Sequence, residues 1–84
     1  MEIIKLREDF IKLGQALKAA NLVDSGVMAK DVILDGLVKV NGEVETRRGK
    51  KLVAGDVVFF NGEEIRIEEW LSNQLIYRIL EIMK

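Results

Sequence analysis

The amino-acid sequence predicts an α+β domain, in which two short helices pack on a small, mostly antiparallel sheet. Apolar residues follow a helical period in the first half of the chain, and from Leu37 onward they alternate with polar residues. Two Asn-Gly pairs, at 41–42 and 61–62, interrupt the alternating region, and such pairs are typical of tight hairpin turns. Helices that precede a run of short strands indicate a layer of helices on one face of a sheet.

A strand and a helix are predicted first. Residues 2–7 form a short strand, and helical periodicity begins a few residues later. Apolar residues recur there at positions i, i+3, i+4 and i+7, which is the spacing of the buried face of a helix. We expect this helix to end near Asn21. Its buried residues are Leu13, Ala16, Leu17 and Ala20.

The second predicted helix is bounded by a capping residue and a glycine. Asp24 or Ser25 can accept hydrogen bonds from the free N–H groups at its start. Gly36 ends it, because glycine adopts the left-handed backbone conformation at little cost. The face of this helix that packs on the domain carries Ala29, Val32 and Ile33.

Short strands are predicted for the rest of the domain. Val38 and Val40 alternate with Lys39, and Val44 begins the return strand of the first hairpin. Further strands are predicted over residues 52–53, 57–60 and 63–67. We therefore expect the domain to comprise residues 1–67.

Helical periodicity returns in the C-terminal segment, residues 68–84. This amphipathic helix is expected to dock on the domain or to form a homodimer. Stacking of Trp70 and Tyr77 on nucleic-acid bases is the least favoured alternative, because neighbouring carboxylates would repel phosphate. The residues expected at a homodimer interface are Leu71, Leu75, Ile79 and Ile82.

Composition excludes several classes of function. The 84 residues include no cysteine and no histidine, which excludes thiol catalysis, imidazole acid–base chemistry and Cys/His zinc sites. With 13 Lys and Arg against 14 Asp and Glu, the net charge is −1, which is unusual for a dedicated nucleic-acid binder. The chain carries no catalytic motif, no metal-ligand spacing and no apolar run long enough to cross a membrane. We expect a cytoplasmic protein without catalytic activity, metal or cofactor.

The strongest functional signal is a basic loop, residues 46–51, between two predicted strands. Arginine binds phosphate oxygens with two parallel hydrogen bonds, and lysine adds a point charge. A glycine inside the loop lets the backbone approach a ligand closely. The residues alone favour phosphate contact and an ordinary solvated hairpin about equally. The loop contains Arg47, Arg48, Gly49, Lys50 and Lys51.

Residues 13–58 resemble the S4 domain, an RNA-binding module named after ribosomal small-subunit protein four. The family signature is two short helices, a strand with a Val-Asn-Gly turn, a basic stretch and a Gly-Asp turn. This chain carries it as LGQALKAANLVDSGVMAKDVILDGLVKVNGEVETRRGKKLVAGDVV. The chain looks similar to the small stand-alone bacterial members, which carry LGQ in the first helix and ETRRGKKL before the Gly-Asp turn. The resemblance implies an S4-like fold with its αL motif.

The resemblance also implies a small, non-catalytic protein that binds structured RNA, with ribosomal RNA favoured. Many members place an arginine after the serine that opens the second helix; Gly26 stands there in this chain, and Lys30 is expected to substitute. The implied RNA-binding residues are Ser25, Gly26, Lys30, Lys39, Asn41, Arg47, Arg48, Gly49, Lys50 and Lys51.

Two experiments separate RNA binding from the alternative, a protein-interaction module or homodimer that uses the C-terminal helix. Replacing the four cations of the basic loop by alanine should abolish most RNA affinity and leave the fold intact. If the C-terminal helix forms a dimer, only the full chain should sediment as one, and a version ending at Ile67 should not.

Overall fold

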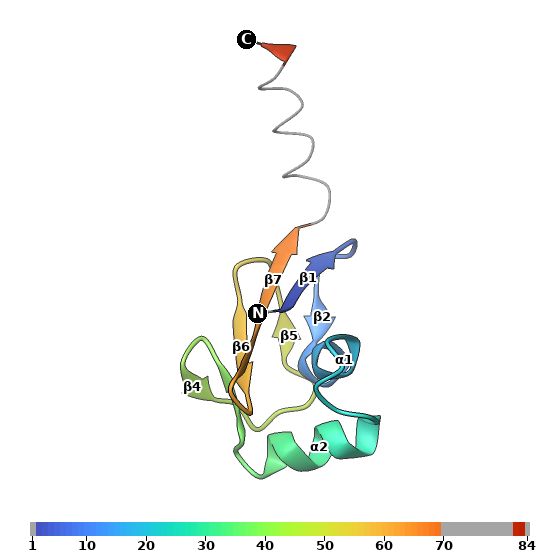
Figure 1. The fold of residues 1–84 in the computed structure, drawn as a ribbon, viewed down its shortest axis with the longest axis vertical. Helices are drawn as coiled ribbons and strands as arrows, with labels where there is room; N and C mark the ends of the chain where they lie inside the picture. Colours follow the sequence, from blue (N-terminus) through green and yellow to red (C-terminus); the bar gives the residue numbers. More distant parts are fainter. Residues whose placement is uncertain (1, 70–81, 84) are drawn as a thin grey trace.

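The computed structural model describes residues 2–69 and 82–83, and the part that it describes in full is a small α+β domain (Figure 1). This confirms the fold class that the sequence predicts. The elements follow in the order β1 (Glu2–Leu6), β2 (Ile11–Lys12), α1 (Leu13–Ala19), α2 (Gly26–Leu34), β3 (Val38–Val40), β4 (Glu43–Val44), β5 (Lys51–Leu52), β6 (Val57–Phe60) and β7 (Glu63–Glu69).

Five of the described strands form one sheet in the order β1-β7-β6-β3-β4. The pairs β3–β4, β3–β6 and β6–β7 are antiparallel, as the hairpin signals predict. β1 lies parallel to β7 at the edge of the sheet (Figure 1), a pairing between the two ends of the domain that the sequence does not indicate. β2 and β5 form a separate antiparallel pair, and β2 is also unpredicted.

Backbone geometry confirms the predicted turns and helix ends. Asn41 and Asn61 have φ of 52° and 54°, and the glycine after each is also positive, as a type I′ hairpin turn requires. The Ser25 hydroxyl accepts a hydrogen bond from the N–H of Met28 at 3.1 Å, so Ser25 is the residue that caps α2. Gly36 follows the end of α2 with φ of 76°.

The core lies between one face of the large sheet and the two helices. Along β3 the valines are buried and Lys39 is exposed, so the sheet presents its inner face to the helices and its outer face to solvent. All four residues that the spacing assigns to the buried face of α1 are buried or partly buried. The fully buried larger side chains are Leu13, Leu17, Ile33, Val38, Leu52, Val58, Ile65 and Ile67.

The last strand of the domain is longer than the predicted strand over residues 63–67. β7 continues to Glu69, and its last two residues pair with Lys5 and Leu6 of β1. Most of the predicted C-terminal helix lies outside the described residues, including Leu71, Leu75 and Ile79; Ile82 is described and is 83% exposed. No described helix is long and apolar enough to cross a membrane.

Candidate nucleic-acid interface

The basic loop is attached to the start of α1 by two backbone hydrogen bonds. The N–H of Leu13 donates to the carbonyl of Lys50 at 2.9 Å, and the N–H of Gly14 donates to the carbonyl of Arg48 at 3.1 Å. The first N–H groups of a helix have no partner within the helix, so the loop satisfies donors that would otherwise need water. The loop therefore has a defined position on the domain.

Gly14 allows this close approach. A Cβ atom at position 14 would lie 2.9 Å from Cγ of Arg48, which is closer than real Cβ contacts allow. With glycine there, the aliphatic part of Arg48 lies directly against α1. The side chain of Arg48 is thus positioned by the helix as well as by its own loop.

Cations from three elements meet beside this contact. They surround a hollow of about 310 Å³ between α1, the start of α2 and the basic loop. Lys12, Lys18 and Arg48 line it, and none of the three forms an ion pair with a carboxylate of the described residues. This basic hollow is lined by Lys12, Gly14, Gln15, Lys18, Gly26, Ala29, Arg48 and Gly49.

Sequence reasoning missed two of these cations, Lys12 and Lys18. A signal was present, because Lys12, Gln15 and Lys18 recur every three residues and so share one side of the first helical turns. The Gln15 side-chain oxygen accepts a hydrogen bond from the N–H of Lys12 at 3.2 Å, which holds the start of this polar stripe in place. The hollow has polar donors but no buried carboxylate, so it is suited to a phosphate anion.

Arg47 and Lys50 lie on a different side of the loop from Arg48. They line a depression of about 380 Å³ beside the first hairpin turn. Nε and Nη2 of Arg47 each donate to the carboxylate of Glu45 at 3.0 Å. This contact lowers the pKa of Glu45 from 4.5 to about 2 and raises the pKa of Arg47. The run of adjacent cations therefore does not form one patch.

Lys51 has a third environment. Its ammonium lies 4.8 Å from the centre of the Phe10 ring, within cation–π distance. Lys51 also pairs in register with Lys12 across the β2–β5 ladder, which places both lysines on the same side of that pair. Lys51 therefore extends the positive charge from the basic hollow toward Phe10.

Asn41 has a structural role in the fold. Its amide donates to Oδ1 of Asp56 at 3.0 Å, and its side-chain oxygen accepts from the N–H of Val57 at 2.9 Å. The other carboxylate oxygen of Asp56 accepts from the N–H of Val53 at 2.9 Å. We call this group of four residues the turn clip, because it joins the Asn-Gly turn to the Gly-Asp turn.

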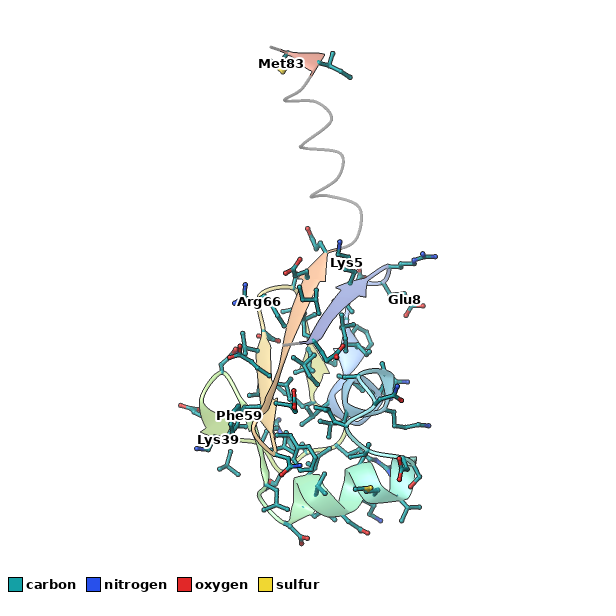
Figure 2. All side chains as sticks on the ribbon, in the orientation of Figure 1. Lys5, Glu8, Lys39, Phe59, Arg66 and Met83 are labelled. Atoms are coloured by element: carbon teal, nitrogen blue, oxygen red, sulfur yellow. The ribbon has the colours of Figure 1, made fainter. Side chains whose placement is uncertain are left out.

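The remaining predicted site residues lie at or away from the hollow. Gly26 lines it, with open space where a side chain would begin, and the hydroxyl of Ser25 is engaged in capping α2. Lys30 is exposed on α2 but does not line the hollow. Lys39 lies on the outer face of the sheet, directly across from Phe59 (Figure 2).

Comparison with known proteins identifies the fold family. A family model described as S4 domain matches residues 4–68, which is more than half of the chain. The chain belongs to the S4 domain family. The matched region includes both helices, the basic loop and the turn clip. The S4 motif recognised in the sequence, residues 13–58, contributes every residue that lines the hollow except Lys12.

Alignments of this S4 domain with two curated relatives span most of the length of each relative. The chain is 46% identical over 59 residues to a protein of Bacillus subtilis named "Probable ribosome maturation protein RlbA", an alignment of 70% of this chain and 83% of the relative. It is 42% identical over 57 residues to the Escherichia coli protein named "Putative RNA-binding protein YbcJ", covering 68% of this chain and 81% of the relative.

Proposed function

We propose that this S4 domain is a non-catalytic protein that binds structured RNA, and that the basic hollow contacts the RNA backbone. The observation that carries the proposal is the convergence of Lys12, Lys18 and Arg48 on one hollow, without ion-pair partners among the described residues. Cations that no carboxylate neutralises keep their full attraction for phosphate. The net charge of −1 is compatible with this role because the positive charge is concentrated locally.

The family and the named relatives support RNA as the ligand. One relative is named as an RNA-binding protein and another as a ribosome maturation protein, so we propose ribosomal RNA as the first RNA to test. The hollow contains no aromatic side chain on which a base would stack. Recognition would therefore depend on the shape and backbone of a folded RNA more than on its base sequence.

The test is a titration of the full chain with fragments of ribosomal RNA that contain helices and junctions, over a series of salt concentrations. Single-stranded polyuridine of equal length is the control RNA. If about four phosphates are neutralised, the logarithm of the association constant should fall with the logarithm of salt concentration with a slope of roughly −3 to −4. Equal affinity for both RNAs, or no binding at low salt, would contradict the proposal.

Self-association is a second candidate, favoured by apolar side chains on the surface. Val44 and Phe59 lie directly across from Lys39 on the outer face of the sheet and are 55% and 45% exposed, and Leu37, just before β3, is 56% exposed. Patches of this kind can mark protein contacts. Sedimentation of the full chain against the variant Val44→Ser/Phe59→Ser tests this candidate, and a version that ends at Glu69 tests self-association through the C-terminal segment. Ending at Glu69 keeps β7 complete, which a version ending at Ile67 would not.

A further inference from the structure

Glu45 holds Arg47 in a defined orientation. The N–H of Glu45 donates to the carbonyl of Val38 at 3.0 Å, which fixes its backbone next to β3. Its carboxylate accepts three hydrogen bonds from Arg47: from the backbone N–H at 3.1 Å, and from Nε and Nη2 at 3.0 Å each. The side chain of Glu45 is 14% exposed, whereas that of Arg47 is 70% exposed.

This geometry leaves one edge of the guanidinium available. An arginine side chain carries five N–H donors in one plane, and Glu45 occupies the edge formed by Nε and one hydrogen of Nη2. The outer edge, formed by Nη1 and the second hydrogen of Nη2, has no partner among the described residues. Two parallel donors on a planar edge match two oxygens of a phosphate group.

We propose that Glu45 is a positioning residue, which orients the outer edge of Arg47 to bind one RNA phosphate through two hydrogen bonds. The inference rests on the proposed RNA binding and adds a second contact point to it. Arg47 lines the depression beside the first hairpin turn, whereas Arg48 lines the basic hollow, so the two arginines would reach different phosphates.

The expected size of the effect follows from the freedom of an exposed arginine. An arginine without a fixed partner loses side-chain entropy when it binds, and Glu45 removes most of that loss in advance. Losing this preorganisation should weaken binding by about 3- to 10-fold. The negative charge of Glu45 repels phosphate and acts in the opposite direction, so the sign of the effect is itself a test of the proposal.

A double-mutant cycle on the full chain tests whether Glu45 acts through Arg47. The dissociation constants of wild type, Glu45→Gln, Arg47→Ala and the double variant are measured with one ribosomal RNA fragment at one salt concentration. Glutamine keeps the size of the side chain and removes its charge. We expect each single variant to bind about 3- to 10-fold more weakly, and the double variant to bind no more weakly than Arg47→Ala.

Three results would overturn the inference. If Glu45→Gln binds RNA as tightly as wild type, Glu45 does not contribute to affinity, and if it binds more tightly, Glu45 repels the phosphate. A further loss from Glu45→Gln in the Arg47→Ala background would mean that Glu45 acts by shaping the loop. If wild type itself binds no RNA, the proposed function fails and the inference fails with it, whereas the first two results leave RNA binding intact. Circular dichroism and urea unfolding of all four proteins would show that the fold is retained.

Discussion

The variant Lys12→Ala/Lys18→Ala distinguishes RNA binding by the basic hollow from RNA binding by the basic loop alone. Both lysines lie outside the basic loop, and both line the basic hollow without an ion-pair partner among the described residues. If the loop alone binds RNA, removing them should have little effect. If the hollow binds RNA, each removal takes away one cation that neutralises a phosphate.

The expected magnitude follows from the release of counterions. Each neutralised phosphate contributes roughly 0.7 to 0.9 to the slope of log K against log salt, so the double variant should have a slope shallower by about 1.4 to 1.8. Over the interval from about 1 M to about 0.15 M salt, this difference corresponds to about 15- to 30-fold weaker binding. Both lysines are exposed, so the fold should tolerate their removal.

The assay is fluorescence anisotropy of a labelled ribosomal RNA fragment at five or more salt concentrations. A matched control is Lys5→Ala/Arg66→Ala, which removes two cations from β1 and β7, away from the hollow (Figure 2). The control should keep the wild-type slope to within the error of the measurement. An unchanged slope for Lys12→Ala/Lys18→Ala, or equal losses in both double variants, would refute the assignment of the hollow.

Three further predictions concern the supporting geometry. Gly14→Ala should displace Arg48 and weaken RNA binding several-fold in the same anisotropy assay. In Gly26→Ala the added methyl group meets open space, so the thermal stability of this variant should stay near that of wild type. Asp56→Ala removes the central acceptor of the turn clip and should lower the free energy of unfolding by about 1–2 kcal/mol in urea titrations; wild-type stability would contradict a structural role. The depressed pKa of Glu45 means that its ion pair stabilises the fold above pH about 4.5 and loses this contribution as pH falls toward about 2. Because Arg47 is solvent-exposed, we expect this contribution to be small, and Glu45→Gln should lack this part of the acid dependence of unfolding.

Local signals allowed much of the fold to be predicted. Tight hairpin turns require positive φ, which Asn and Gly tolerate, and the cap of α2 and Gly36 act over three or four residues, so each can be recognised from its neighbours. The pairing of β1 with β7 joins residues about sixty positions apart, and no local pattern specifies it. The last strand was predicted too short for the same reason, because Glu69 belongs to β7 through its partner Leu6 in β1.

The candidate site was less predictable than the fold. A run of cations in the sequence indicates a charge, but an irregular loop directs neighbouring side chains to different sides. Arg48 joins two lysines of other elements, whereas Arg47 turns to Glu45. The spacing of Lys12 and Lys18 is a weak periodic signal. It indicates a shared cationic surface only together with the packing of the loop on α1. Tertiary contact therefore decided which cations act together.

The same contacts give the turn motifs and the basic loop of this chain a common structural role. The turn clip joins Asn41 to Asp56 and so closes the segment between them, which carries every cation of the basic loop. The middle of that segment is attached to α1 through the N–H groups of Leu13 and Gly14. A loop that is held at both ends and at its middle has lost most of its conformational freedom in the folded domain. In the proposed function, binding would cost less ordering entropy for this reason, and the Asn-Gly and Gly-Asp turns would support affinity without contacting the RNA.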